Sequence, residues 1–310
     1  MKTLVLSLML FLAVGVAAQP AGQAEQHFQN GNRLYAAKNY AGAITSYSEA
    51  IRLNPNLAVA WYNRGQSYFY SQNYTAAIYD YTRAIVLNPK NDNALFQRGL
   101  AKYNMKLHKE AIEDYTAALA LKPADASIWY NRGIVHADEK RDDLALIDYN
   151  EAIRLSPRYV KALINRSGVH FRQNKLDLSI ADLDAAIAVD PTVAEAWGNR
   201  GIGHSRSGNY ALALADLNQA IKLNPKSPKF YLDRGIAHTR ARKADEAIAD
   251  LTYAIGLDQN YAAAIIMRGA VYFDKKQYPQ ARADAERVLV LRPGDKLATT
   301  LLTKLKALGQ

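Results

Sequence analysis

The stretch Trp61-Tyr62-Asn63-Arg64-Gly65 decides the fold, because the same five residues return at 129–133. They return again at 197–201, with glycine in place of the tyrosine. The copies begin 68 residues apart (129 − 61 and 197 − 129), and a shorter copy, Arg98-Gly99, lies halfway between the first two. The period is therefore 34 residues (98 − 64), and a fixed period of this length is typical of a protein built from stacked repeats.

Eight repeats follow one another without an insertion when the sequence is aligned on its prolines. They are 24–57, 58–91, 92–125, 126–159, 160–193, 194–227, 228–261 and 262–295, and places within each are numbered from 1 to 34. Proline occupies place 32 in every repeat except 228–261, which has Gln259. Because proline cannot continue a helix, place 32 is expected to end one repeat and turn the chain into the next. Each repeat is predicted to contain two helices, over 58–71 and 75–87 in the second repeat.

The large and small residues of the repeat resemble the signature of the tetratricopeptide repeat family. In the second repeat that signature is carried by Trp61, Gly65, Tyr68, Ala77, Tyr81, Ala84 and Pro89. The resemblance covers 24–295 and implies an all-α fold, a right-handed superhelix or α-solenoid of helix-turn-helix repeats with a concave groove. Residues 296–310 are expected to form a capping helix after Asp295, with a stripe of leucines packed on the last repeat: Leu297, Leu301, Leu305 and Leu308.

The N-terminal residues 1–18 have the pattern of a secretory signal peptide. Lys2 precedes an apolar run over 4–16, and small residues end at Ala18, where cleavage is expected. Residues 19–23 would then be a short polar lead. The run is short for a membrane span, so we expect no transmembrane segment after cleavage, with a retained anchor as the alternative. Export to the bacterial periplasm is the first expectation and an extracellular location the second.

Composition excludes several kinds of site. There is no cysteine, which removes disulfides, thiolate metal sites and a cysteine nucleophile. Phosphate loops, dinucleotide-binding glycines, nucleophile elbows and metalloprotease helices are absent from the sequence. We therefore expect no enzymatic activity, no cofactor, no metal and no small-molecule substrate. The net charge of +10, or +9 after the loss of Lys2, favours anionic partners.

Arginine at place 7 and aspartate at place 23 occur together or not at all. Repeat one has Asn30 and Ser46 instead. The arginines are Arg64, Arg98, Arg132, Arg166, Arg200, Arg234 and Arg268, and the aspartates are Asp80, Asp114, Asp148, Asp182, Asp216, Asp250 and Asp284. We interpret each pair as a bidentate bridge within one repeat. Pairing each aspartate with the next repeat's arginine would leave Asp284 without a partner.

Four histidines share place 11, which tyrosine usually fills in the family: His136, His170, His204 and His238. A metal site is not expected, because neighbouring helices lie about 8–10 Å apart whereas metal–ligand bonds are about 2 Å long. We interpret the histidines as partly buried replacements for tyrosine. A sharper hypothesis is that acid charges them and loosens repeats four to seven.

In the family, places 2, 5, 6, 9, 12 and 13 of the first helix face the groove. Place 6 carries a row of amides that could bind the backbone of an extended peptide: Asn63, Gln97, Asn131, Asn165 and Asn199. Aromatic residues follow at places 5 and 12 of the early repeats: Tyr62, Phe96, Tyr130, Phe69 and Tyr103. The later repeats are basic at places 2 and 13: Lys161, Lys229, Arg172, Arg206 and Arg240. The groove should therefore run from aromatic to basic.

The predicted function is that of a non-catalytic scaffold that binds an extended peptide or protein segment in its groove. A partner with an acidic segment would suit the basic end. The known clamp for chaperone-tail carboxylates is not expected, since repeats one to three have Phe28, Asn93 and Gln97 where that clamp has cations. The alternative is binding of an anionic polymer, a cell-envelope glycan or nucleic acid, although export makes nucleic acid unlikely as a partner.

Overall fold

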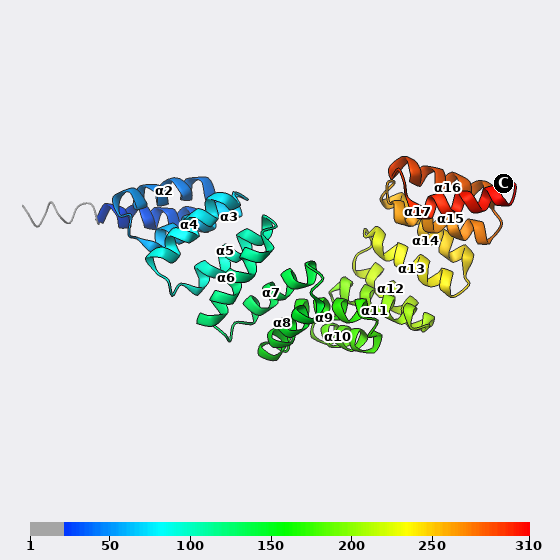
Figure 1. The fold of residues 1–310 in the computed structure, drawn as a ribbon, viewed down its shortest axis with the longest axis horizontal. Coiled ribbons are helices and arrows are strands. Elements are labelled where there is room, and N and C mark those ends of the chain that lie inside the picture. Colours follow the sequence, from blue (N-terminus) through cyan, green and yellow to red (C-terminus); the bar gives the residue numbers. More distant parts are fainter. Residues whose placement is uncertain (1–21) are drawn as a thin grey trace, which may run out of the picture. The chain divides into compact units, whose positions relative to one another are not determined.

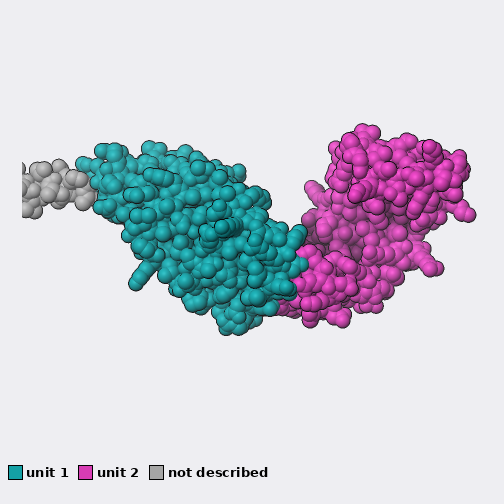
Figure 2. Space-filling view, in the orientation of Figure 1, with its two compact units in different colours: residues 1–157 teal, residues 158–310 magenta. Residues whose placement is uncertain are grey.

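The computed structural model describes residues 22–310, and all regular secondary structure within that range is helical. The expected signal peptide and residues 19–21 of the expected polar lead lie outside the described residues. Residues 22 and 23, assigned to the lead from sequence, already belong to the first helix, over 22–36. The chain divides into two compact units, 1–157 and 158–310 (Figure 2).

The first unit contains repeats one to four, except for the last two residues of repeat four, 158–159, which fall in the second unit. After the helix over 22–36 come α2 (Tyr40–Leu53), α3 (Ala58–Tyr70), α4 (Tyr74–Leu87), α5 (Asp92–Asn104), α6 (His108–Leu121), α7 (Ala126–Asp138) and α8 (Asp142–Leu155). Each odd-numbered helix from α3 to α15 is the first helix of a repeat, and each even-numbered helix from α2 to α16 is the second (Figure 1).

The second unit contains the remaining four repeats and the capping helix. Its elements are α9 (Val160–Arg172), α10 (Leu176–Val189), α11 (Ala194–Arg206), α12 (Tyr210–Leu223), α13 (Pro228–Arg240), α14 (Ala244–Leu257), α15 (Ala262–Asp274), α16 (Tyr278–Leu291) and α17 (Lys296–Ala307). The predicted all-α stack of helix pairs is confirmed in both units. No helix within 22–310 is both apolar enough and long enough to traverse a lipid bilayer.

Helices pack in a regular order inside each unit. The two helices of a repeat pack on each other, and the second packs on the first helix of the following repeat. First helices of neighbouring repeats also contact each other directly, as α3 does with α5 and α11 with α13. No comparable contact joins two second helices within the described residues. The first helices therefore form the inner row of each unit.

In the repeats that carry glycine at place 8, the core depends on a close approach at that place. A Cβ atom on Gly133 would lie 2.8 Å from Cε1 of Tyr149, which is fully buried, and a Cβ on Gly201 would lie 2.8 Å from Cγ of Leu217. Each glycine therefore lets a second helix insert a large side chain at place 24. That residue is tyrosine in the first unit and leucine in repeats five to seven.

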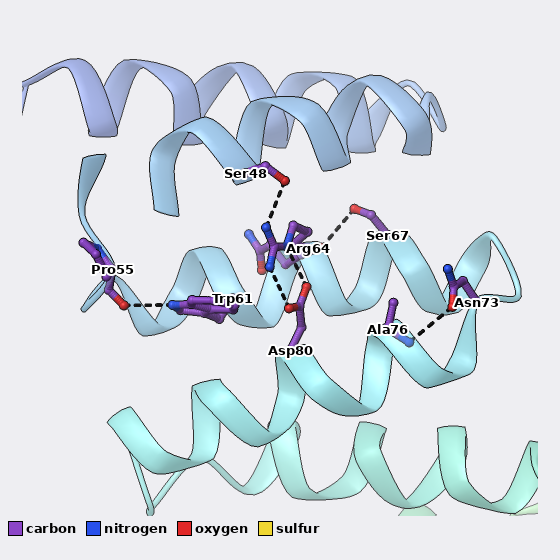
Figure 3. Close-up of polar contacts among 9 residues, drawn as sticks. Ser48, Pro55, Trp61, Arg64, Ser67, Asn73, Ala76 and Asp80 are labelled. Atoms are coloured by element: carbon purple, nitrogen blue, oxygen red, sulfur yellow. Dashed lines mark hydrogen bonds and ion pairs between the residues drawn. The ribbon is translucent and has the colours of Figure 1, made fainter. Parts of the chain in front are cut away.

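Tryptophan at place 4, present in repeats two, four and six, links the preceding turn to the helix that follows it. Trp61 Nε1 donates a hydrogen bond of 2.8 Å to the carbonyl oxygen of Pro55 (Figure 3), and Trp129 donates in the same way to Pro123. The turn inside a repeat is also regular: place 15 has a positive φ in all eight repeats, from Lys38 (58°) to Gly208 (83°). The turn inside a repeat therefore has the same backbone conformation in all eight repeats.

The capping helix α17 begins as predicted, but part of its predicted apolar stripe is wrong. Asp295 Oδ1 accepts bonds of 3.0 Å from the backbone N–H groups of residues 297 and 298. Ala298, Leu301 and Leu305 are buried against the last repeat. Leu297 is 63% exposed and Leu308 52% exposed. The helix turns residue 298 rather than 297 towards α16, and residue 308 follows the end of the helix.

Candidate binding surface on the first helices

The seven arginines at place 7 bond to the aspartates of their own repeats. In each pair Nε donates to one carboxylate oxygen and Nη2 to the other, with N–O distances from 2.5 to 2.9 Å. Figure 3 shows this arrangement for Arg64 and Asp80. In repeat one, Asn30 Nδ2 donates to Ser46 Oγ at 2.8 Å, so a neutral pair takes the same position. These arginines therefore have a structural role, which is to join the two helices of a repeat.

The same arginines make a third bond that sequence analysis missed. Arg64 Nη1 donates to Ser48 Oγ in the preceding repeat at 2.9 Å (Figure 3). The equivalent bonds run from Arg98 to Thr82, Arg132 to Thr116, Arg200 to Asp184, Arg234 to Asn218 and Arg268 to Thr252, with distances from 2.6 to 3.1 Å. All acceptors stand at place 25, which has a short side chain with an oxygen in repeats one to seven. That column was the available signal, and it links neighbouring repeats.

Place 11 faces the aspartate of this network. The Nε2 atoms of His136, His170, His204 and His238 lie 3.7–3.9 Å from Oδ2 of the aspartate in the same repeat. Lys102, at the same place in repeat three, forms an ion pair of 2.7 Å with Asp114. The histidines are mostly enclosed, as predicted, and no group of three or more potential metal ligands occurs within residues 22–310.

Acid is expected to lower the melting temperature through the histidines. Burial holds the pKa of His136, His170 and His238 below its usual range, although the neighbouring aspartates oppose this shift. Because the unfolded pKa is about 6.5, the unfolded chain binds more protons below that pH, and stability falls as pH decreases. Scanning calorimetry at pH 8 and pH 5 should show a lower melting temperature at pH 5.

The matched control replaces these three histidines by tyrosine, the residue found at place 11 as Tyr68 and Tyr272. Other groups titrate in this pH range, so the control carries the test. The variant should lose less of its melting temperature on acidification than the native chain. Equal losses in both proteins would contradict the assignment.

The amide row is not uniform in its bonding. Asn63 Nδ2 donates to Asn32 Oδ1 at 2.9 Å, and Asn131 Nδ2 donates to the Ser127 carbonyl at 2.8 Å. Gln97 and Asn165 are half-buried on α5 and α9. A ligand would therefore compete with internal bonds at two of the predicted positions. Asn199, described below, lies in the wall of a pocket.

The predicted aromatic residues take part in packing. The place 5 rings of Tyr62, Phe96 and Tyr130 lie 5.8–6.1 Å from the place 24 tyrosine rings of their own repeats. At place 12, Phe69 packs edge-on against Tyr74, and Tyr103 donates from its hydroxyl to Asp138 at 2.7 Å. All five remain half-buried, so they combine a packing role with partial access from solvent.

The predicted cations differ in their surroundings. Lys161, Arg172, Arg206, Lys229 and Arg240 are all exposed. Lys229 forms an ion pair of 3.0 Å with Asp233, which stands at place 6 where earlier repeats have an amide. Burial raises the pKa of Asp233, and the charge of Lys229 partly opposes that rise. Lys229 is therefore a weaker source of positive charge than the sequence suggested, because Asp233 was overlooked.

Arg206 and Arg240 are the clearest cations of the second unit. The Arg206 guanidinium lies 4.9 Å from the centre of the Phe171 ring, and Arg240 Nη1 donates weakly to Ser205 Oγ at 3.3 Å. Within the described part of the chain, neither has a carboxylate within ion-pair distance. Both can therefore accept a carboxylate from a ligand.

A pocket of about 190 Å³ lies among the first helices of the second unit. Its wall is formed by Ser167, Gly168 and Phe171 of α9, Ser179 of α10, Asn199 and Ile202 of α11, and Lys229 of α13. Gly168, Phe171, Asn199 and Lys229 stand at places 9, 12, 6 and 2, which were predicted to face the groove. Two predicted site residues, Asn199 and Lys229, thus meet in one cavity although they lie 30 positions apart (229 − 199).

Family models match most of the sequence. The model described as tetratricopeptide repeat matches 96–160, 168–228, 201–262 and 232–296, a second model of that description matches 58–91, and one described as TPR repeat matches 31–70. The chain belongs to the tetratricopeptide repeat family. Members of this family are typically protein-interaction scaffolds and generally not catalysts. A search of curated proteins found no match.

Solved structures show the same fold at low identity. A tetratricopeptide repeat protein from Parabacteroides merdae is 19% identical, with a TM-score of 0.66 over 80% of this chain and 98% of that one. The Cut9–Hcn1 hetero-tetramer gives 17% identity and a TM-score of 0.64, over 89% of this chain and 54% of that one. YrrB, described as having an unusual peptide-binding site, gives 22% and 0.52, over 63% and 97%.

Proposed function

We propose that this protein is a non-catalytic scaffold that holds an extended segment of another protein along its first helices. The observation that carries the proposal is an open pocket among α9, α11 and α13 together with Arg206 of α11 and Arg240 of α13, for which residues 22–310 supply no ion-pair partner. The place 7 arginines, by contrast, are occupied by their aspartates and add little to a binding surface. YrrB, a structure of the same fold, is described as having an unusual peptide-binding site, and this supports the proposal.

Reversing the charge of Arg206 and Arg240 is expected to abolish capture of the partner. The mature chain, 19–310, would be immobilised and incubated with cell-envelope extract, and bound proteins identified by mass spectrometry. The variant Arg206→Glu/Arg240→Glu should lose the proteins that the native chain captures, because repulsion replaces attraction for carboxylates. The control Lys222→Glu/Lys226→Glu makes the same change of charge at exposed positions in α12 and its following turn.

Loss of capture in both double variants would mean that overall charge, not the inner row, determines binding. That outcome would favour the alternative, an anionic polymer. A polymer would also show a steep linear fall of log K with log[salt]. The binding constant of a peptide held partly by apolar contacts should depend less on salt concentration.

We further propose that the protein acts after export, with the periplasm as its location. Support comes from the apolar run and small residues over 4–18. Fractionation of cells expressing the full chain, followed by N-terminal sequencing, tests this. The expected product begins at Gln19 and appears outside the cytoplasm. An uncleaved cytoplasmic product would contradict it.

A further inference from the structure

The pocket of the second unit lies where the glycine of repeat five stands at place 9 instead of place 8. In the repeats that carry glycine at place 8, place 9 has a side chain, as in Ile134, Ile202 and Ile236. Repeat five has serine at place 8 and glycine at place 9, Ser167-Gly168. Place 9 therefore has no side chain where isoleucine stands in the repeats on either side of it.

Packing does not require glycine at position 168. A Cβ atom on Gly168 would meet no other atom within 4 Å, whereas one on Gly201 would lie 2.8 Å from Leu217 Cγ. Glycine inside a helix is destabilising relative to alanine, since it loses more conformational freedom on folding. Gly168 is thus unfavourable for α9 and unexplained by a close contact. What it provides is the open space beside Phe171 and Ile202.

A second cavity supports the link between place 9 and open space. In repeat eight, place 9 is Ala270, and a cavity of about 210 Å³ lies there, bordered by Ile266 and Phe273 of α15 and by the capping helix. Two charged residues, Asp274 and Lys304, also line this second cavity. It therefore serves as an internal comparison of similar size in a different electrostatic setting.

The size and walls of the repeat-five pocket fit an aliphatic side chain. Its volume of about 190 Å³ exceeds the roughly 150 Å³ of a buried apolar cavity that accepts benzene. Phe171 and Ile202 form apolar walls, while Asn199 and Lys229 add polar groups. An extended segment could place one apolar side chain in the pocket and keep its backbone near the Asn199 amide, which can both donate and accept.

The positive charges beside the pocket favour acidic residues next to the apolar side chain of the bound segment. The Arg206 guanidinium lies over Phe171, which is itself part of the pocket wall. Arg240 reaches from α13 to Ser205 of α11, one residue from Arg206. Among the described residues neither arginine has an ion-pair partner, and Lys229 adds a charge partly balanced by Asp233. Carboxylates on the segment would complement this rim.

We propose that the pocket at Gly168 anchors one aliphatic side chain of an extended partner segment, and that Arg206 and Arg240 bind acidic side chains next to it. The proposal rests on the proposed scaffold function and specifies the partner's chemistry: an internal acidic segment with a single leucine-like residue. The apolar anchor thus lies within the basic half of the inner row, not in the aromatic half.

The test uses a fluorescent peptide, acetyl-Glu-Glu-Asp-Leu-Asp-Glu-Glu-amide, titrated with the mature chain and followed by anisotropy. Blocked termini remove the end carboxylate, and an otherwise identical peptide with leucine at a free C-terminus reports whether the end carboxylate is preferred. The variant Gly168→Ile restores the residue found at place 9 in neighbouring repeats and fills the pocket. It should weaken binding by about tenfold or more, because a buried leucine contributes at least that much.

Three comparisons make the result specific. Ala270→Ile fills the cavity of repeat eight and should leave binding unchanged. A peptide with alanine for leucine should bind the native chain about tenfold more weakly, and Gly168→Ile should not weaken it further. Gly168→Ala, which meets no atom within 4 Å, provides a smaller filling that should preserve the fold and show an intermediate loss.

The outcomes separate this proposal from the scaffold function. If the leucine peptide binds and is weakened by Arg206→Glu but not by Gly168→Ile, the pocket proposal is overturned and the scaffold function stands. Failure of the leucine peptide to bind, or tighter binding of the free C-terminal peptide, also overturns the internal-segment proposal. Capture from envelope extract decides the scaffold function independently.

Discussion

Replacing Arg132 by alanine is expected to lower the free energy of unfolding by about 3 kcal/mol, because it leaves a buried carboxylate without its partner. Asp148 is only 2% exposed in its side chain and Arg132 16%. The substitution removes two bonds to Asp148, of 2.9 and 2.7 Å, and one to Thr116, of 3.0 Å. It therefore weakens both the repeat itself and its link to the preceding repeat.

A double-mutant cycle in urea measures the pairing. Arg132→Ala, Asp148→Ala and the double variant should show a coupling energy above about 1 kcal/mol, since each single change already removes the shared bonds. Thr116→Val removes only the bond between repeats and should cost about 1 kcal/mol. Additive losses in the cycle would contradict the pairing as a source of stability.

Replacing Gly201 by alanine is expected to destabilise the second unit by about 2 kcal/mol, whereas the same change at Gly168 should be neutral or stabilising. The new Cβ at 201 would lie 2.8 Å from Leu217 Cγ and 3.0 Å from the backbone oxygen of Ala213. The backbone cannot yield without moving α12, so overpacking exceeds the gain in helix propensity. A Cβ atom at position 168 would meet no atom within 4 Å, so only the gain in helix propensity remains.

Thermal or urea unfolding of the two variants gives the comparison directly, since the chemical change is identical and both sites lie inside helices of the second unit. Gly201→Ala should unfold at lower urea than native, and Gly168→Ala at equal or higher urea. Equal destabilisation by both substitutions would show that glycine at place 8 is not required for close packing.

The fold could be predicted from sequence because its determinants are local and repeated. Proline at place 32, the small residue at place 8 and the large one at place 24 act within a single helix pair, and they recur in register. The matched presence of arginine and aspartate also indicated the pairing seen in all seven repeats, as between Arg64 and Asp80.

What sequence analysis missed depends on which side chains become neighbours in space, and a column of similar residues does not by itself identify those neighbours. Acceptors at place 25, such as Ser48 and Thr82, look like ordinary surface residues until an arginine of the next repeat is placed beside them. Asp233 breaks the amide row and partly balances Lys229, which a count of cations alone overlooks. Residues such as Tyr62 pack and face solvent at once, so helical phase alone could not assign them to one role.

The pocket was the least predictable feature of the site. The sequence shows that glycine stands at place 9 instead of place 8 in Ser167-Gly168. From the sequence alone, a neighbouring side chain could equally have filled the space beside this glycine. Only the arrangement of Phe171, Ile202 and Lys229 around it shows that the space stays open.

Site-specific photocrosslinking tests the central claim, that a protein segment lies along the first helices of the second unit. A photoreactive amino acid would be placed at 229, in the pocket wall on α13, or at 222, exposed on the second helix α12. After irradiation with envelope extract, position 229 should give a discrete protein adduct that the Arg206→Glu/Arg240→Glu change removes, and position 222 should give none. Adducts of equal yield from both positions, or from 222 alone, would contradict the claim.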